Sequence, residues 1–161
     1  MSASAENEAS TKQESGPSGA VQDDQKKIAV RTGDGEVFEL NEEVAMEMET
    51  IKTFYQEDDK CETVTMPLPN VERWELQKVI EYCSKYLELK NKEDFDRKLK
   101  VFQAEFIKSL SPKCLLCLAN TANYLDIQYL QDFICQAVAD HIKNKDVEYV
   151  RELFEVENDF V

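Results

Sequence analysis

The residues of this chain best suited to chemistry are two cysteines in the stretch CLLC, Cys114 and Cys117. They follow Ser111-Pro112, a signal for a helix start, and a thiol near a helix N-terminus has a lowered pKa. A zinc site would need a second such pair, and a thioredoxin-type site would need a preceding strand; the sequence shows neither. Because both cysteines lie among leucines, we expect them to pack as small hydrophobic residues, with no metal and no cofactor. A thiol-dependent enzyme is the alternative.

Other catalytic arrangements have little support. The single histidine, His141, lies on the polar side of an expected helix, and one histidine supplies neither a histidine-rich metal site nor a convincing triad. Acidic pairs such as Glu42-Glu43 fall in a strongly acidic segment without an apolar pocket, a pattern typical of a solvated surface. Two of the four glycines lie at positions 16 and 19, which leaves too few for a phosphate-binding loop. We therefore predict that the protein is not an enzyme.

The charge of the chain excludes several classes of partner. A net charge of -14 over 161 residues repels phosphates and anionic headgroups, so nucleic acid and membrane surfaces are not expected partners. The charge is uneven: residues 28–66 hold 11 Asp and Glu against three Lys and Arg, whereas residues 67–108 hold eight against nine. The middle of the chain is therefore the part that would tolerate an acidic partner.

Several features indicate the cytoplasm and the nucleus as the location. The sequence contains no run of about 18 apolar residues, the length that a membrane-spanning helix needs. The first 20 residues lack the basic start and apolar run of a signal peptide. Five cysteines, an odd number, fit a reducing compartment better than a disulfide framework.

Short β-prone runs precede the helical patterns. Residues 1–27 have almost nothing to bury, and we expect a disordered tail there. The first two runs flank Gly33-Asp34-Gly35, which predicts a hairpin. Asn41 is expected to cap a helix over residues 42–56. The three expected strands are residues 28–32, 36–40 and 63–68.

Helices fill the rest of the chain. Asn70 is expected to cap a helix over 71–89. Residues 89–101 look like a charged linker, and a frayed helix is the alternative there. The later starts are predicted at Ser111, at Asp126 and, for the last helix, at Asn144 or Asp146, all residues that cap helices. Three short strands need helices over one face, so we predict an α+β domain with a C-terminal helical extension.

Two stretches carry a resemblance to a known family. MPLPNVERWELQKVIEYC, residues 66–83, and the long run from ANTANYLDI to NDF, residues 119–160, closely resemble the S-phase-kinase-associated (Skp) adaptor family. The shorter stretches DGEVFEL and TIKTF match as well. The resemblance implies a BTB/POZ fold over residues 28–125, followed by F-box-binding helices over 126–161.

The resemblance also implies a function. Members of the family link a cullin scaffold to F-box substrate receptors in an SCF-type ubiquitin ligase, without catalysing a reaction themselves. By this resemblance Asn123 and Tyr124 face the cullin. The residues that inherit F-box binding lie on the apolar faces from residue 119 onward: Ala119, Ile127, Leu130, Ile134, Val138, Ile142, Val150 and Phe154.

Three departures from the family pattern affect these expectations. The family continues past NDF with an acidic helix, whereas this sequence ends at Val161, so we expect a weaker grip on the F-box. The serine-rich tail precedes the point where many members begin, and NKDVEYVR lacks a proline that many carry. The alternative is a POZ-type subunit that has lost F-box binding and either self-associates through the same surface or serves another complex.

Overall fold

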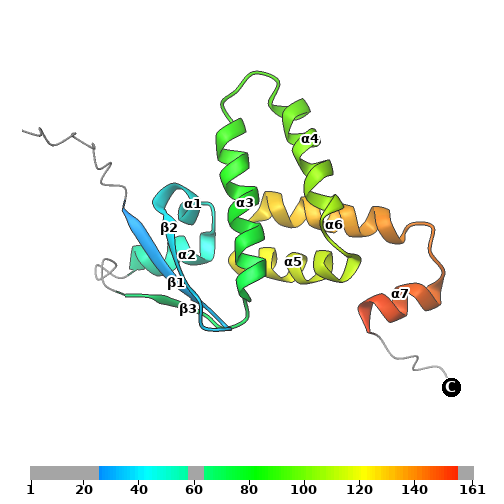
Figure 1. The fold of residues 1–161 in the computed structure, drawn as a ribbon, viewed down its shortest axis with the longest axis horizontal. Coiled ribbons are helices and arrows are strands. Elements are labelled where there is room, and N and C mark those ends of the chain that lie inside the picture. The colour runs from blue at the N-terminus through cyan, green and yellow to red at the C-terminus, as the bar shows by residue number, and fades with distance from the viewer. Residues whose placement is uncertain (1–25, 58–63, 156–161) are drawn as a thin grey trace, which may run out of the picture.

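The structure is a computed structural model, and it describes residues 26–57 and 64–155. Within these residues the protein consists of a three-stranded sheet and seven helices. In Figure 1 the sheet, α1 and α2 lie together at one end, α3 crosses α5 and α6, and α7 lies at the other end. The predicted α+β class is confirmed. The elements are β1 (Lys27–Thr32), β2 (Val37–Asn41), α1 (Glu42–Met46), α2 (Glu49–Glu57), β3 (Met66–Leu68), α3 (Arg73–Leu89), α4 (Phe95–Lys108), α5 (Pro112–Leu125), α6 (Gln128–Ile142) and α7 (Val147–Phe154).

The strand β1 is the centre of the sheet, in the order β2-β1-β3. It pairs antiparallel with β2, where Ile28 lies opposite Leu40, and parallel with β3, where Val30 lies opposite Met66. All four of these side chains are buried, so one face of the sheet forms part of the core. The predicted third strand is shortened to three residues. Most of the predicted tail lies outside the described residues, and Lys27 already belongs to β1.

The β1–β2 turn needs its two glycines for different reasons. Gly33 donates its N–H to the carbonyl of Val71 at 2.8 Å, and a Cβ on Gly33 would lie 2.3 Å from the carbonyl oxygen of Pro69. Gly35 has φ of +89°, a conformation that side chains disfavour. The turn is therefore docked tightly against the segment that leads into α3.

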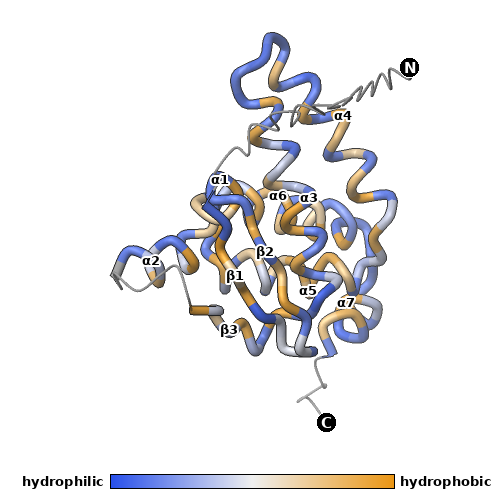
Figure 2. Tube along the Cα trace, turned by 60° about the vertical axis from the view of Figure 1, so that its left-hand side comes forward, coloured by the Kyte–Doolittle hydropathy of each residue, from blue (hydrophilic) through white to orange (hydrophobic). Residues whose placement is uncertain are grey.

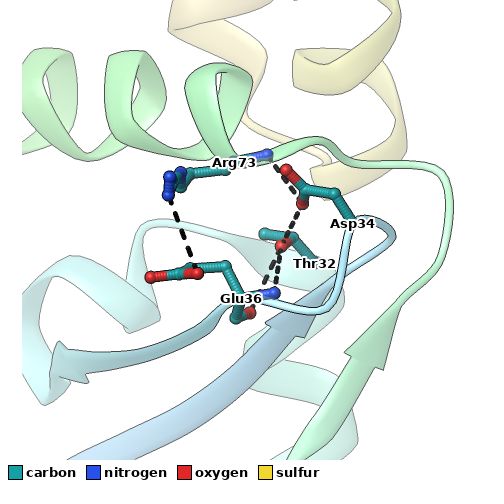
Figure 3. Close-up of polar contacts among 4 residues, drawn as sticks. All are labelled: Thr32, Asp34, Glu36 and Arg73. Carbon is teal, nitrogen blue, oxygen red and sulfur yellow. Dashed lines mark hydrogen bonds and ion pairs between the residues drawn. The ribbon is translucent and has the colours of Figure 1, made fainter.

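Asp34, at the tip of this turn, supplies the cap of α3 (Figure 3). Its carboxylate accepts a hydrogen bond from the backbone N–H of Arg73 at 3.1 Å, and Thr32 donates its hydroxyl to the same carboxylate. The Thr32 bond lowers the pKa of Asp34. The prediction that Asn70 caps this helix is wrong, because α3 begins three residues later and takes its cap from a distant turn.

The helix predicted over residues 42–56 is in fact two helices. Asn41 occupies the N-cap position without a side-chain bond. At the break, Met48 donates its N–H to the carbonyl of Ala45, three residues back, at 3.1 Å. This tighter turn lets Met48 and Ile51 both enter the core, where each is fully buried.

Helix α4 takes up part of the predicted linker at 89–101. The ring of Phe95 packs edge-on against Tyr86 on α3, with centroids 5.6 Å apart. Tyr82 also contacts Phe106 edge-on, with centroids 5.4 Å apart, and contacts Phe102 in a tilted arrangement at 5.6 Å. These aromatic contacts hold α4 against α3, so only residues 90–94 connect the two helices.

One continuous core runs from Ile28 in β1 to Ile134 in α6. The boundary predicted between residues 125 and 126 falls inside this core, so it marks no break in packing. Glu75 on α3 and Thr121 on α5 form a buried hydrogen bond across the core, and burial raises the pKa of Glu75. Among the described helices, none has the length and apolar character needed to span a bilayer.

Candidate functional site

The corner between α5 and α6 is made by Asp126 in a left-handed conformation, with φ of 55°. Its N–H bonds to the carbonyl of Asn123 at 3.2 Å, and the next N–H, of Ile127, bonds to the carbonyl of Ala122 at 3.0 Å. Asp126 therefore ends α5. The prediction that it caps α6 is wrong, because Ile127 takes the N-cap position and buries its side chain.

Asn123 and Tyr124 lie on the last turn of α5, beside this corner. Asn123 is exposed, and its side-chain oxygen accepts a hydrogen bond from Gln131 on α6 at 3.2 Å. Tyr124 is half-buried against the core, and its carbonyl accepts a bond from the hydroxyl of Thr50 on α2 at 2.7 Å. The two residues therefore form a partly exposed polar surface where α2, α5 and α6 meet.

An apolar groove of about 500 Å³ lies between α5, α6 and α7. Each helix contributes an apolar side chain that the sequence had marked: Ala119 from α5, Val138 from α6 and Phe154 from α7. Phe154 is 43% exposed, which is unusual for so large an apolar side chain. The groove is thus an apolar surface that residues 26–57 and 64–155 leave open.

Helix α7 is held at the edge of this groove by a few contacts. Asp146 caps it by accepting the N–H of Tyr149 at 2.8 Å, which confirms the predicted helix start. The Tyr149 hydroxyl lies 2.7 Å from Nε2 of His141, and Lys113 pairs with Glu155 at 3.3 Å. Within α7 one side chain, Leu153, is classed as buried.

Comparison with known proteins agrees with this arrangement. Residues 26–88 match the tetramerisation domain of the Skp1 family, and residues 128–161 match its dimerisation domain. The chain belongs to the Skp1 family. It is 40% identical over 151 residues to SKP1-like protein 20 of Oryza sativa subsp. japonica, covering 83% of this chain and 85% of that protein. It is 41% identical over 143 residues to SKP1-like protein 1A of Arabidopsis thaliana, covering 84% and 88%.

Skp1-family membership bears out the main expectations from the sequence. The POZ match accounts for the small sheet and its covering helices, and so confirms the BTB/POZ fold. The family role is that of an adaptor in an SCF-type ubiquitin ligase, between a cullin and F-box proteins. The alternative of a POZ subunit that has lost F-box binding is not favoured.

The eight candidates for F-box binding separate into three groups in this Skp1-family chain. Ala119, Val138 and Phe154 line the groove. Ile142 and Val150 are half-buried and lie outside its lining. The buried group consists of Ile127, Leu130 and Ile134, which are 1%, 1% and 0% exposed.

The burial of this last group corrects their expected role. In this structure these side chains lie inside the core and leave no surface that a partner could contact. The periodic pattern of α6 marked them because core-facing and partner-facing apolar residues follow the same helical spacing.

Seven residues that line the groove were not among the candidates. Four of them are apolar or cysteine side chains: Leu116 and Cys117 on α5, Cys135 on α6 and Leu153 on α7. Leu116 and Ala119 are three residues apart on α5 and therefore share a face, a spacing that could have identified Leu116. No pattern within a single helix could have paired Cys117 with Cys135, because their proximity to one groove depends on how α5 and α6 pack.

Two of the described cysteines, Cys83 and Cys117, have thiols with raised pKa values. Cys117 is exposed at the groove, and its pKa is raised by partial burial and by the charge of Glu75. Burial raises the pKa of Cys83 to about 11. A nucleophilic or redox-active thiol needs a shift in the opposite direction.

Proposed function

We propose that the groove between α5, α6 and α7 holds the apolar face of an F-box helix, and that Asn123 and Tyr124 contact the cullin. The protein then works by association alone, with no catalytic step of its own. The observation that carries this proposal is the groove itself: three successive helices present Ala119, Val138 and Phe154 to solvent side by side.

The shape and chemistry of the groove suit a helix as its occupant. An amphipathic helix inserts apolar side chains three and four residues apart into a groove between helices. The Lys113–Glu155 pair lies at the rim, where it can bond to polar groups on the flanks of such a helix. Phe154, exposed and aromatic, has the properties of residues that dominate binding energy at interfaces.

The polar corner suits a different partner. Asn123 has amide groups at the surface, and Tyr124 combines contact area with a hydroxyl. The corner involves α2 and the end of α5, whereas the groove lies between α5, α6 and α7. Separate surfaces allow a cullin and an F-box protein to bind at the same time, as an adaptor requires.

Substitution of Phe154 tests the F-box part of the proposal. We expect Phe154→Ala to weaken binding of an F-box domain by about 30-fold, the effect of losing an aromatic anchor worth ~2 kcal/mol. Val147→Ala is the matched control, because Val147 lies on the same helix, is 63% exposed and is not part of the groove lining. Titration calorimetry measures both. Equal affinity in the two variants would refute the assignment of the groove.

The cullin surface is tested by Asn123→Ala/Tyr124→Ala. We expect this double variant to lose at least about tenfold in affinity for the cullin and to keep its affinity for the F-box domain. Gln136→Ala, on the exposed face of α6, is the control. Because Tyr124 also packs against the core, thermal unfolding of each variant is recorded first. Unchanged cullin binding by a folded double variant would remove the site.

The groove also supports self-association when no F-box protein is present. The match to the Skp1 dimerisation domain covers α6 and α7, which form two of its walls. If copies of the chain pair through this groove, an F-box domain will dissociate the dimer in a sedimentation experiment. A location in the cytoplasm and nucleus is proposed from the reduced cysteines that the sequence favours, and imaging of a tagged chain tests it.

A further inference from the structure

The hairpin of α3 and α4 differs in charge from the rest of the molecule. Residues 85–108 hold seven Lys and Arg against five Asp and Glu, a net charge of +2 in a chain of -14. Figure 2 shows a hydrophilic connection between these helices, with hydrophobic positions recurring along α4. Between the two helices lies a second groove, of about 480 Å³, which we call the α3–α4 groove.

The floor of the α3–α4 groove is apolar and firmly built. Leu89 and Phe102 line it, and Val101 at its edge is 63% exposed. Phe102 packs against Tyr82, and Tyr82 accepts a hydrogen bond from Gln103 at 2.9 Å. The groove is therefore a preformed feature, which reduces the ordering that binding would require.

Cations outnumber carboxylates on the rim. Lys85 and Lys92 both pair with Glu88 at 3.3 Å, and this sharing lowers the pKa of Glu88. Arg97 pairs with Asp94 at 3.3 Å, whereas the side chain of Lys98 forms no ion pair or hydrogen bond with a described residue. The full rim consists of Lys85, Lys92, Arg97 and Lys98 against Glu88 and Glu105.

We propose that the α3–α4 groove binds an acidic peptide segment of a partner protein, anchored by one large apolar side chain. The apolar floor of Leu89 and Phe102, with Val101 at its edge, takes the anchor, and the ammonium of Lys98 pairs with a carboxylate of the peptide. A nucleic acid fits less well, because its phosphates are more closely spaced than the carboxylates of a peptide and would meet Glu88 and Glu105 on the rim. This groove shares no lining residue with the groove between α5, α6 and α7, so the inference stands apart from the proposed F-box function.

A subtractive selection with the full chain tests this inference. A displayed library of random peptides of about twelve residues, long enough to span a groove of this kind, is first depleted on Lys98→Glu/Val101→Ser. The remaining peptides are then selected on the unaltered protein. We expect the enriched peptides to be rich in Asp and Glu around a Leu, Ile or Phe, and to bind less tightly as the salt concentration rises. Failure to enrich any peptide, or enrichment without an acidic bias, would overturn the proposal.

Single variants and their controls locate the binding of one enriched peptide. We expect Lys98→Glu and Val101→Ser each to weaken it by about fivefold to tenfold. The controls make the same changes elsewhere: Lys143→Glu at an exposed helix end, and Val147→Ser at a residue that is also 63% exposed. Equal losses in the controls would show that the peptide binds elsewhere and would refute the assignment.

Two further arms decide between occupants. A single-stranded oligonucleotide that bound more tightly than the peptide and was lost in Lys98→Glu would replace the acidic peptide as ligand. If a synthetic peptide of residues 1–25 displaced the selected peptide, the occupant of the groove would be a segment of this chain. That result would overturn the proposal of a partner protein. Lys98→Glu should bind an F-box domain as tightly as the unaltered protein. This measurement distinguishes a failure of the peptide-binding proposal from a failure of the proposed F-box function.

Discussion

The interior shared by α3 and α5 and the helix α7 are stabilised in different ways. Between α3 and α5, side chains such as Val79 and Leu118 are at most 1% exposed, and a buried hydrogen bond joins the helices. In α7, Leu153 is the most buried side chain at 9% exposed, and Phe154 lies open to solvent. The interior is complete without a partner, whereas α7 presents apolar surface that a partner would cover.

Helix α6 takes part in both regions. Its first half enters the core through Leu130 and Ile134, which are fully buried. Its second half carries Val138, which lines the groove and is half-buried. One turn of helix thus separates a residue that stabilises the fold from a residue available to a partner.

The largest effect should come from Ile134→Ala. Removing a fully packed side chain leaves a cavity and should lower the free energy of unfolding by about 2–5 kcal/mol. Val138→Ala, one turn away, should cost less stability and weaken F-box binding selectively. Urea unfolding and binding titrations measure the two effects. A stable Ile134→Ala protein with selective loss of F-box binding would erase the distinction between the two regions.

A smaller, pH-dependent effect is expected at Glu75. Burial raises the pKa of its carboxyl in the folded state above the ordinary value of 4.5, so the folded state holds the proton more tightly than the unfolded state. The stability of the protein should therefore fall as pH rises from about 4.5 through the folded pKa. Glu75→Gln resembles the protonated form and should be the more stable protein above that window.

Urea midpoints measured from pH 4 to pH 8 compare Glu75→Gln with the unaltered chain. Glu81→Gln is the control, because Glu81 is exposed on the same helix. The control should follow the unaltered chain at every pH. Parallel curves for all three proteins would show that the interior does not penalise the Glu75 charge.

The smallest effect is expected from Asp146→Ala, and it should be confined to α7. Loss of this cap costs about 1 kcal/mol of helix stability, while the core does not depend on it. Amide exchange in residues 147–154 should become faster, with exchange in α3 and α5 unchanged. Glu152→Ala, exposed on the same helix, is the control. Equal acceleration in α3 would show that α7 and the interior unfold together.

Local chemistry made several elements predictable. Ser111-Pro112 predicted the start of α5, and the Ser111 hydroxyl accepts the N–H of Cys114 at 3.2 Å. Asp146 predicted the start of α7. Gly33 and Gly35 predicted the hairpin. Its turn requires Gly33 for the close approach to Pro69 and Gly35 for the positive φ. These features depend on neighbours within a few residues, so a short stretch of sequence contains the information.

Long-range contacts decided the features that were predicted wrongly. The cap of α3 comes from Asp34, a residue 39 positions before Arg73, instead of Asn70. Asp126 ends α5 because the chain must turn sharply to bury Ile127. Both residues have the chemistry of a cap, but the packing of distant elements selects which helix end each one serves.

The sequence by itself determined the family, the α+β class and the apolar positions of α6, because these depend on residue identity and spacing. It could not determine which of those positions are buried in the core and which stay accessible, since Ile134 and Val138 repeat with the same helical period. Only the tertiary structure decided this, by burying Ile134 in the core and leaving Ala119, Val138 and Phe154 around a groove. The physical reason is that the burial of a residue depends on how the elements pack together, so it cannot be deduced from the sequence of a single helix.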